Sequence, residues 1–502
     1  MKIITMRHIL GNKVLQYDVD DRGVIVDERE YDRTVNPKPN IADWVKEHMV
    51  FWYDMSKPVD TYSQNFNDWR PYPSVNADII ITSTSFVITR FATPNDTVKY
   101  YIPGKTKNFP GMKVEVKGIV DGQELYWGYS ANVKLVNITS DGTYDIPPLE
   151  TVNGNLSFRN GNIVGACNIT ITQLPSGQSV PTNEILKANP YLQDFSGNNR
   201  PLKLNNFLFA AMSGVGGYET NFSDNSIWIS SPQRGNLINN HTYNPMLKGS
   251  SSGLYTATGS VKVKFKATVT GMKSGYRLEF GSGDVAPSDK SIYEDGEYEF
   301  GSGDVAVPYG FKLYADDYSN PNTDVIIELK EVYPNALVTD GVDDYGVVEN
   351  FKSLQNYMMF FQCAIIRPAT SKGMFSTTPI EGNIKGWMLL QGNSANEVMF
   401  GNNVYKNFNV TSSIGDKISY VLSANNELMT CYVGEEKATV TGTYKQTGAN
   451  MSLFLSDNNN KTRFGSMAFY KSILFDSVPT KENDGFTEQD LIDYVLENLI
   501  TK

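Results

Sequence analysis

Three short runs of alternating apolar and polar residues occur twice in this chain, in the same order. The first set comprises Met112–Lys117, Asp141–Ile146 and Asn168–Pro175, and the second comprises Val261–Lys266, Asp295–Phe300 and Asp324–Pro334. Alternation with a period of two is typical of strands that bury one face. The repetition therefore predicts two copies of one small antiparallel β-sandwich.

Length and composition favour an all-β protein with several domains. The chain has 502 residues, which is enough for about three domains. Aromatic residues make up 12% of it, and its 41 glycines fall among short alternating runs with turns such as Asp141-Gly142 and Asp295-Gly296. Such runs and turns are typical of strands rather than helices.

One helix is predicted at the C-terminus, over residues 486–502. Thr487 is placed to cap its first turn, and Glu488 and Asp490 complement the positive end of the helix. Its apolar residues form one stripe, which we expect to pack on a sandwich: Leu491, Ile492, Val495, Leu496, Leu499 and Ile500. A second, short helix is expected over residues 41–49.

The charge balance argues against a nucleic-acid partner. Lys and Arg total 44 against 55 Asp and Glu, a net charge of −11, and the basic residues are scattered. The sequence shows no secretory segment and no long apolar span, so we expect synthesis in a cytoplasm and no membrane insertion. Cys167, Cys363 and Cys431 are too few and too widely separated for a disulfide framework and are expected to be buried free thiols.

Motifs for catalysis are missing from the sequence. Its three histidines, His8, His48 and His241, cannot supply a His-Glu-x-x-His metal site and are poorly placed for a Ser-His-Asp triad. The E-x-D-x-x-E strand that places paired carboxylates in jelly-roll glucanases is absent as well. We therefore predict no enzymatic activity, no cofactor and no metal.

Two aromatic segments are candidates for carbohydrate binding. Trp69 and Tyr72 lie in the proline-rich run Trp69–Pro73, and Trp127 and Tyr129 flank Gly128. Loop-like surroundings would leave these rings free to stack on sugar faces. By contrast, Trp228 and Trp387 lie in apolar runs and are expected in the core.

Four further segments together resemble the laminin-G-like, or concanavalin A-like, jelly roll. They are Met49–Asp54, Leu192–Leu204, Thr339–Val348 and Met467–Leu474, the last followed by Phe486–Ile492. The order matches the family, but more than a hundred residues separate the first from the second and the second from the third. The resemblance implies a jelly-roll sandwich that is interrupted by the two predicted sandwiches.

Two acidic positions fall within these segments. Asp194 lies where some jelly-roll relatives bind calcium, but the sequence continues with Asn198-Asn199-Arg200 instead of a glycine-rich run. A role in capping the adjacent turn is the favoured interpretation, with calcium as the weaker alternative. Asp343 and Asp344 stand at a strand entrance, where we expect them to stabilise the turn.

The predicted domain order follows from these segments. It is an N-terminal attachment arm over 1–40, jelly roll over 41–74, a first insert over 75–176, jelly roll over 177–225, a second insert over 226–335, jelly roll over 336–485 and the helix over 486–502. In the arm, residues 13–19 and 22–26 are expected to pair as strands, and an edge hairpin of the central domain is the alternative.

Phe51–Asp54, Asn189–Asn198, Met212–Tyr218 and Asp340–Tyr345 as a set resemble structural proteins of phages of Bacteroides, including the crAss-like group. The resemblance implies a virion protein that is made in the host bacterial cytoplasm, most simply a head fibre that adheres to host or mucus glycans. The arm would dock on other virion proteins, and a homodimer or homotrimer is expected. The alternatives are a tail appendage or receptor-binding protein, a polysaccharide depolymerase and a bacterial surface lectin.

Overall fold

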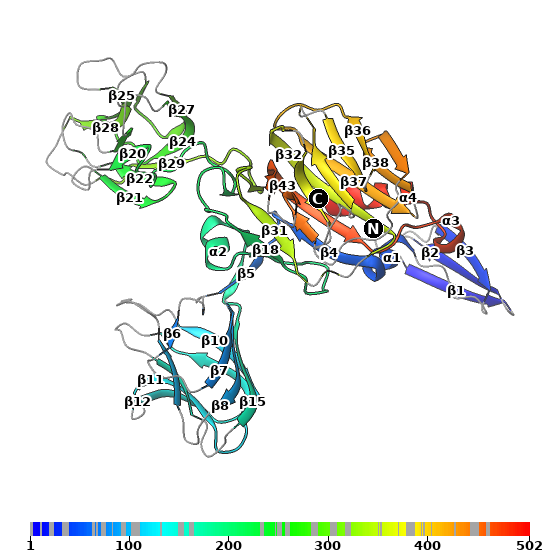
Figure 1. Ribbon diagram of the computed structural model, residues 1–502. Coiled ribbons are helices and arrows are strands. Elements are labelled where there is room, and N and C mark those ends of the chain that lie inside the picture. The colour runs from blue at the N-terminus through cyan, green and yellow to red at the C-terminus, as the bar shows by residue number, and fades with distance from the viewer. Residues whose placement is uncertain are drawn as a thin grey trace.

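The computed structural model describes most of residues 4–501. The residues outside the description within that range are 11–12, 20–24, 33–39, 63–65, 67–68, 72–76, 83, 92–96, 102–110, 131–132, 149–154, 160–164, 231–234, 246, 248–253, 257–261, 283–289, 302–308, 317–322, 350, 352–353, 370, 378–386, 393, 395–396, 403, 426–427, 442–450 and 458–461. Figure 1 shows a central sandwich with two smaller β domains beside it.

The central domain is a jelly roll of two packed sheets, as predicted. One sheet contains ten strands: β17 (Tyr191–Leu192), β18 (Leu202–Asn205), β31 (Tyr345–Val348), β40 (Met451–Leu453), β33 (Lys372–Ser376), β34 (Trp387–Gln391), β35 (Glu397–Asn402) and β36 (Val404–Asn409), with β41 (Leu455–Asp457) and β42 (Thr462–Phe464) beside β33. The other contains eight: β19 (Gly214–Val215), β30 (Leu337–Val338), β43 (Ser466–Phe475), β32 (Tyr357–Arg367), β37 (Lys417–Asn425), β38 (Leu428–Val433) and β39 (Glu436–Thr441), with β4 (Met49–Asp54) on β43.

The long apolar run in β32 is explained by burial on both faces of its sheet. Met359 and Phe361 point into the core between the two sheets. Met358 and Phe360 point the other way, into a second core that includes the C-terminal helix. Successive side chains of a strand face opposite ways, so both sets must be apolar.

The predicted helices at residues 41–49 and at the C-terminus are present. They are α1 (Ile41–His48) and α4 (Glu488–Val495), and a π-helical turn over Leu496–Ile500 extends α4. Thr487 and Asp490 form a reciprocal capping box at the start of α4. The predicted stripe, including Leu491 and Val495, packs on the outer face of the eight-stranded sheet. Two short helices were not predicted, α2 (Asn183–Ala188) and α3 (Lys481–Asp484).

Each insert is a sandwich of two five-stranded sheets. In insert 1 the first sheet contains β13 (Gly142–Ile146), β10 (Met112–Lys117), β15 (Gly165–Leu174), β8 (Ser85–Phe91) and β7 (Ala77–Ile81). The second sheet contains β12 (Val133–Ile138), β11 (Glu124–Ser130), β14 (Asn155–Arg159), β9 (Thr97–Tyr101) and β6 (Arg70–Pro71). In insert 2 the first sheet contains β27 (Gly296–Gly301), β24 (Lys264–Thr270), β29 (Ile326–Leu329), β22 (Thr242–Pro245) and β21 (Gly235–Asn239). The second sheet contains β26 (Lys290–Ile292), β25 (Tyr276–Ser282), β28 (Tyr309–Ala315), β23 (Leu254–Thr256) and β20 (Trp228–Ser230).

The two inserts have one topology, which confirms that they are related. With the strands of each insert numbered from its own first strand, both have the orders 8-5-10-3-2 and 7-6-9-4-1. The turn before the eighth strand is also the same. The carboxylate of Asp141 accepts a hydrogen bond from the Ile119 N–H at 2.8 Å, and that of Asp295 accepts one from the Met272 N–H at 2.7 Å.

One of the three sequence matches between the inserts was out of register. Val116 pairs with Gly142 in insert 1, and Val269 pairs with Gly296 in insert 2. Met112–Lys117 therefore corresponds to Phe265–Thr270, four residues beyond the predicted partner. A period-two pattern looks the same after a shift of four residues, so alternation alone could not fix the register.

Both inserts begin earlier than the predicted boundaries of 75 and 226. Phe66 and Trp69 pack in the core of insert 1, and Phe222 packs in the core of insert 2. These aromatic residues belong to the connecting segments by sequence but are buried by the inserts. Insert 1 is joined to the jelly roll by paired strands, β5 (Val59–Thr61) on entry and β16 (Gly177–Ser179) on exit.

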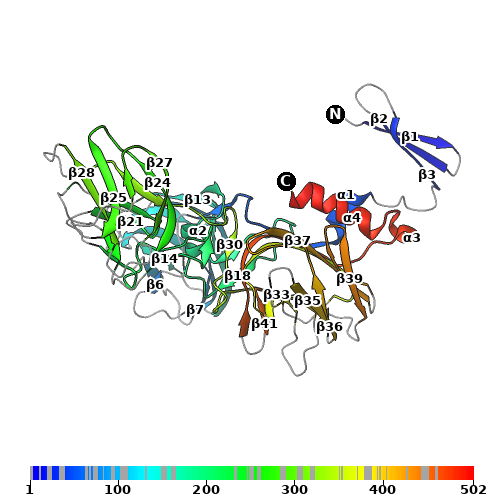
Figure 2. The same ribbon diagram turned by 90° about the horizontal axis from the view of Figure 1, so that it is seen from above.

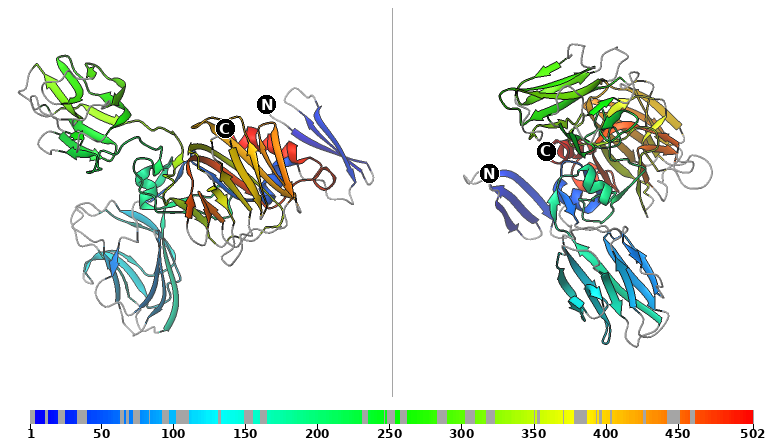
Figure 3. Two further views of the ribbon diagram at one scale, coloured as in Figure 1. Left: turned by 45° about the horizontal axis from the view of Figure 1, so that its top comes forward. Right: turned by 90° about the vertical axis from the view of Figure 1, so that its left-hand side faces the viewer.

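The N-terminal residues form a separate three-stranded antiparallel sheet, not an edge hairpin of the jelly roll. Its strands are β1 (Ile4–Leu10), β2 (Lys13–Val19) and β3 (Ile25–Asp32). The pairing of β2 with the segment that follows it was predicted, but only the first two residues of β3 fall within the predicted strand over 22–26, and β1 was not predicted. The run Asn36-Pro37-Lys38-Pro39-Asn40, whose two prolines predict a stiff linker, falls almost wholly outside the described residues. Figures 1, 2 and 3 place this sheet at the end of the jelly roll opposite to both inserts.

Candidate functional site

The tryptophans predicted to bind carbohydrate are core residues of insert 1. Trp69 is 2% exposed and Trp127 is 1% exposed, and their ring centroids lie 6.0 Å apart. Trp127 lies on β11 and faces inward like Leu125, while Trp69 packs against Phe66 and Phe86. The prediction is therefore wrong for both, because proline and glycine residues beside a tryptophan do not by themselves keep its ring out of a core.

The remaining predicted aromatics are only partly described. Tyr72 lies outside the described residues, and Tyr129 belongs to β11, although its side chain is not described. Trp228 is buried in insert 2, as predicted. Trp387 lies in β34, and its side chain is likewise not described.

Asp194 organises the loop between β17 and β18. Its carboxylate accepts hydrogen bonds from the backbone N–H groups of Trp52 at 2.9 Å, Ser196 at 2.9 Å and Arg200 at 3.0 Å. The Ser196 hydroxyl donates a fourth, at 2.9 Å. Both carboxylate oxygens are thus engaged by the protein, which confirms the interpretation of Asp194 as a turn cap.

A second acidic loop precedes β31. Oxygens of Asp340, Asp343 and Asp344 lie within 4.8 Å of one another, a donor set of the kind that hard cations such as Ca²⁺ prefer. Asp344 is fully buried and accepts hydrogen bonds from the Ser213 hydroxyl and the Asp340 N–H, both at 3.0 Å. Burial, together with the nearby negative charge of Asp340, raises the pKa of Asp344 to about 8. These contacts support the predicted turn-stabilising role for Asp344.

The three cysteines and two of the three histidines, His48 and His241, have described surroundings. Cys363 and Cys431 are buried free thiols, as predicted, and burial raises the pKa of both. Cys167, which was also predicted to be buried, is a free thiol that is only half-buried. His48 contacts Asp476 at 2.9 Å beside α1, and His241 stacks on Tyr218 with ring centroids 3.6 Å apart.

None of the helices in the described part of the chain is both long and apolar enough to cross a membrane.

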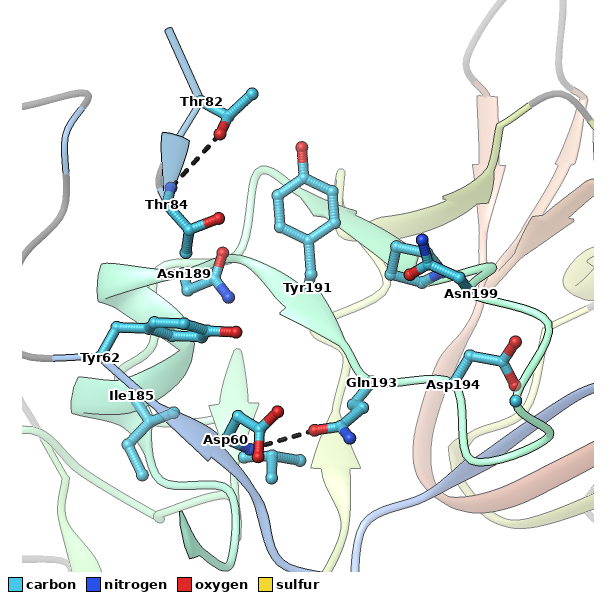
Figure 4. A pocket seen from close by; sticks show the side chains of 13 residues that line it. Asp60, Tyr62, Thr82, Thr84, Ile185, Asn189, Tyr191, Gln193, Asp194 and Asn199 are labelled. Carbon is cyan, nitrogen blue, oxygen red and sulfur yellow. Dashed lines mark hydrogen bonds between the residues drawn. The ribbon is translucent and has the colours of Figure 1, made fainter. Parts of the chain in front are cut away.

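A pocket lies where insert 1 joins the jelly roll, and sequence reasoning missed it. Its volume is about 470 Å³. Four segments line it: the end of β5, the β7–β8 turn of insert 1, helix α2 and the loop from β17 to β18. The lining residues are Val59, Asp60, Tyr62, Thr82, Thr84, Ile185, Asn189, Tyr191, Gln193, Asp194, Gly197, Asn199 and Pro201. We call this the junction pocket; Figure 4 shows its side chains.

The junction pocket combines aromatic rings with planar hydrogen-bonding groups. Tyr62 and Tyr191 are both half-buried, so part of each ring is accessible. Gln193 Oε1 accepts a hydrogen bond from the Asp60 N–H at 3.0 Å, and Gln178 donates to the Asp60 carboxylate at 3.1 Å. Burial, with a contribution from Asp60, raises the pKa of Tyr62, so its hydroxyl stays protonated at neutral pH. Such a set suits an uncharged, hydroxyl-rich ligand.

No family model matches the chain, and no curated protein matches it. Solved structures similar to it include the CBM40 of Ruminococcus gnavus IT-sialidase bound to alpha2,3 sialyllactose (11% identity, 26% of this chain and 80% of that chain covered, TM-score 0.22). Domain 4 of AbnA, a Geobacillus stearothermophilus arabinanase, in complex with arabinotriose is another (14% identity, 31% of this chain and 80% of that chain covered, TM-score 0.21). Trypanosoma rangeli sialidase in complex with sialic acid is a third (9% identity, 99% of this chain and 94% of that chain covered, TM-score 0.26). At these TM-scores the likenesses bear on neither activity nor ligand.

Proposed function

We propose that this chain is a structural protein of a bacteriophage virion, a head fibre or decoration protein that displays glycan-binding β-sandwiches. The virion role rests on the set of segments that resemble structural proteins of Bacteroides phages. The arrangement of the chain is consistent with it, since the N-terminal sheet and the two inserts lie at opposite ends of the jelly roll. One end can dock while the other is displayed.

The junction pocket is the observation on which the glycan-binding role rests. Tyr62 and Tyr191 offer ring faces to the apolar side of a sugar, and Gln193 and Asn199 offer amide groups to its hydroxyls. Walls from insert 1 and from the jelly roll line the pocket, so the ligand would contact both domains.

Binding without hydrolysis is the activity we propose. A depolymerase needs a pair of carboxylates free to act on the glycosidic bond. In the junction pocket Asp194 accepts four hydrogen bonds from the protein, and Asp60 accepts one from Gln178. The Asp194 carboxylate therefore serves to hold its own loop and is not free to act on a glycosidic bond. For this reason we favour a binding protein over a depolymerase. A tail appendage fits the same pocket and remains the alternative placement.

Two experiments test the two parts of the proposal. Glycan binding is measured by array and by saturation-transfer NMR on the full chain and on Tyr62→Ala and Tyr191→Ala. We expect binding by the full chain and a loss of about tenfold in affinity for either variant. A blank array, or release of reducing ends from a bound polysaccharide, would overturn the binding role.

Virion placement is tested by deleting residues 1–39. We expect the truncated protein to fold, as judged by its melting curve, but to be absent from purified virions, where the full chain is found by mass spectrometry. Light scattering on both proteins tests whether the predicted dimer or trimer depends on the N-terminal sheet. Incorporation of the truncated protein at normal levels would contradict docking through this sheet.

A further inference from the structure

The shared topology of the inserts allows their tips to be compared residue by residue. In insert 1, Glu124 at the start of β11 pairs with Arg159 on β14. In insert 2, Arg277 near the start of β25 pairs with Tyr314 on β28, at the same place in the same sheet. The pair next to it in the ladder consists of two core residues in both inserts. It is Leu125 with Phe158 in insert 1 and Leu278 with Leu313 in insert 2.

Insert 1 fills this position with ion pairs. The Glu124 carboxylate contacts Lys134 Nζ at 2.6 Å and Arg159 at 4.0 Å. In insert 2 the Arg277 guanidinium lies 4.6 Å from the ring centroid of Tyr314, and its Nε contacts the Glu279 carboxylate at 2.9 Å. The same scaffold therefore has a carboxylate between two cations at one tip, and an arginine between an aromatic ring and a carboxylate at the other.

A pocket of about 540 Å³ opens beside Arg277, and we call it the tip pocket. Besides Arg277 and Tyr314, it is lined by Tyr276, Tyr293, Ser274, Gly275, Ala315 and Asp316. Tyr293 is 63% exposed, so most of its ring is accessible to a ligand. Its counterpart in insert 1 is Thr139, because Ile292 and Ile138 occupy matching places opposite Leu278 and Leu125.

A glycine keeps the acidic side of the pocket in place. Gly275 has φ +85°, and a Cβ at this position would lie 2.9 Å from the Asp316 carboxylate. The Asp316 N–H also donates to the Gly275 carbonyl at 3.1 Å. Any side chain at 275 would therefore be strained and would push Asp316 away from the pocket.

The tip pocket faces away from the jelly roll. Strand β29 ends at Leu329, which pairs with Ala267 of β24, and from there the chain returns to the central domain. At the other end of the same strand pair, Thr270 of β24 pairs with Ile326 of β29. The loop 271–275 follows Thr270 and so lies at the far end of the sandwich. Figures 1 and 2 show β25 and β28 on the side of insert 2 remote from the jelly roll. A pocket there is open to large ligands such as polysaccharides.

We propose that the tip pocket is a second glycan-binding site, specific for a neutral pyranose unit. The rings of Tyr276 and Tyr293 supply flat apolar faces, and Arg277 and Asp316 supply planar groups for sugar hydroxyls. Arg277 is already paired with Glu279, and Asp316 adds a negative charge, so a sugar carboxylate would be repelled. The site extends the proposed glycan-binding role and is independent of the junction pocket.

The test uses the full chain with Tyr62→Ala, so that binding at the junction pocket is weakened by about tenfold. Saturation-transfer NMR is recorded with the methyl glycosides of glucose, galactose, mannose and N-acetylglucosamine, and with N-acetylneuraminic acid as the acidic comparator. We expect at least one neutral glycoside to bind to Tyr62→Ala and to lose about tenfold in affinity in Tyr62→Ala/Tyr293→Ala. The matched control, Tyr62→Ala/Thr139→Ala, changes the equivalent position of insert 1 and should bind as Tyr62→Ala does.

Each other outcome has a definite meaning. Binding by the unaltered chain that Tyr62→Ala abolishes would overturn the tip site and leave the junction pocket standing. Equal binding by Tyr62→Ala and Tyr62→Ala/Tyr293→Ala would also overturn it, by placing the sugar elsewhere. Preference for N-acetylneuraminic acid would contradict the neutral ligand class, and no binding by the unaltered chain would overturn both proposals. Tyr293 is largely exposed, so its removal should leave the melting temperature unchanged.

Discussion

The Trp52 N–H donates a 2.9 Å hydrogen bond to Asp194 Oδ1, although 142 positions separate the two residues. Insert 1 occupies most of that interval, so this bond ties together the two jelly-roll segments that flank it. The same carboxylate holds the N–H groups of Ser196 and Arg200. One side chain thus closes the jelly roll where the insert interrupts it.

Asp194→Ala should destabilise the central domain by about 2–4 kcal/mol, because it leaves several backbone N–H groups without their acceptor. Calorimetry of the full chain, which separates the transitions of the domains, measures the effect. Asp194→Asn keeps one acceptor oxygen and should show a smaller loss. If Asp194 bound calcium instead, added Ca²⁺ would raise the melting temperature of the unaltered chain but not of Asp194→Ala.

Trp127→Ala should destabilise insert 1 by about 3–5 kcal/mol, the usual effect of removing a large ring from a packed core. The transition of the central domain should not move, because the two cores are separate. Leu135→Ala is the control, since Leu135 lies on the neighbouring strand β12 but is 43% exposed. An unchanged insert 1 in Trp127→Ala would restore this residue as a candidate for ligand binding.

Asp344 should make the central domain less stable as the pH rises. Its pKa is about 8 in the folded protein against an ordinary value of 3.8, so between these values the folded state binds a proton that the unfolded state lacks. The free energy of unfolding then falls with increasing pH across that window. Asp344→Asn should remove this slope, as measured by denaturant unfolding at about pH 5 and about pH 8. A slope unchanged by the substitution would contradict the assignment.

His241 should act in the opposite direction on insert 2. Burial lowers its pKa to about 4 from 6.5, despite the opposing influence of Glu184. The unfolded state therefore binds the extra proton between about pH 4 and 6.5, and stability is lost as the pH falls through this range. His241→Phe keeps a ring against Tyr218 but cannot titrate, so the acid sensitivity of insert 2 should disappear. Calorimetry at several pH values reads this out, and persistent sensitivity would point to another group.

The sequence was most informative where one residue type has one structural use. The Asp-Gly pairs marked equivalent turns in the two inserts, since Asp141 and Asp295 each accept a backbone hydrogen bond that closes the turn. Thr487 with Asp490 marked the start of the last helix. Both signals are local, so they do not depend on how distant segments meet.

The sequence was least informative where the surroundings of a residue come from elsewhere in the chain. Trp69 follows a stretch that reads as a loop, yet Phe86 and Trp127 bury it. The junction pocket draws Tyr62 and Tyr191 from segments that insert 1 separates, and no local pattern brings such residues together. Helix α2, only six residues long, is held by packing of Leu186 rather than by a long apolar stripe.

The paired strands β5 and β16 bring the chain back beside the point where it left the jelly roll. Because the two ends of the insert lie side by side, the jelly roll accommodates the whole inserted domain as it would a short loop between two strands. Units of this kind can be gained, duplicated or exchanged between related genes without disturbing the strand order of the host. The two inserts, alike in strand order but different at their tips, have the form that such exchange would leave behind.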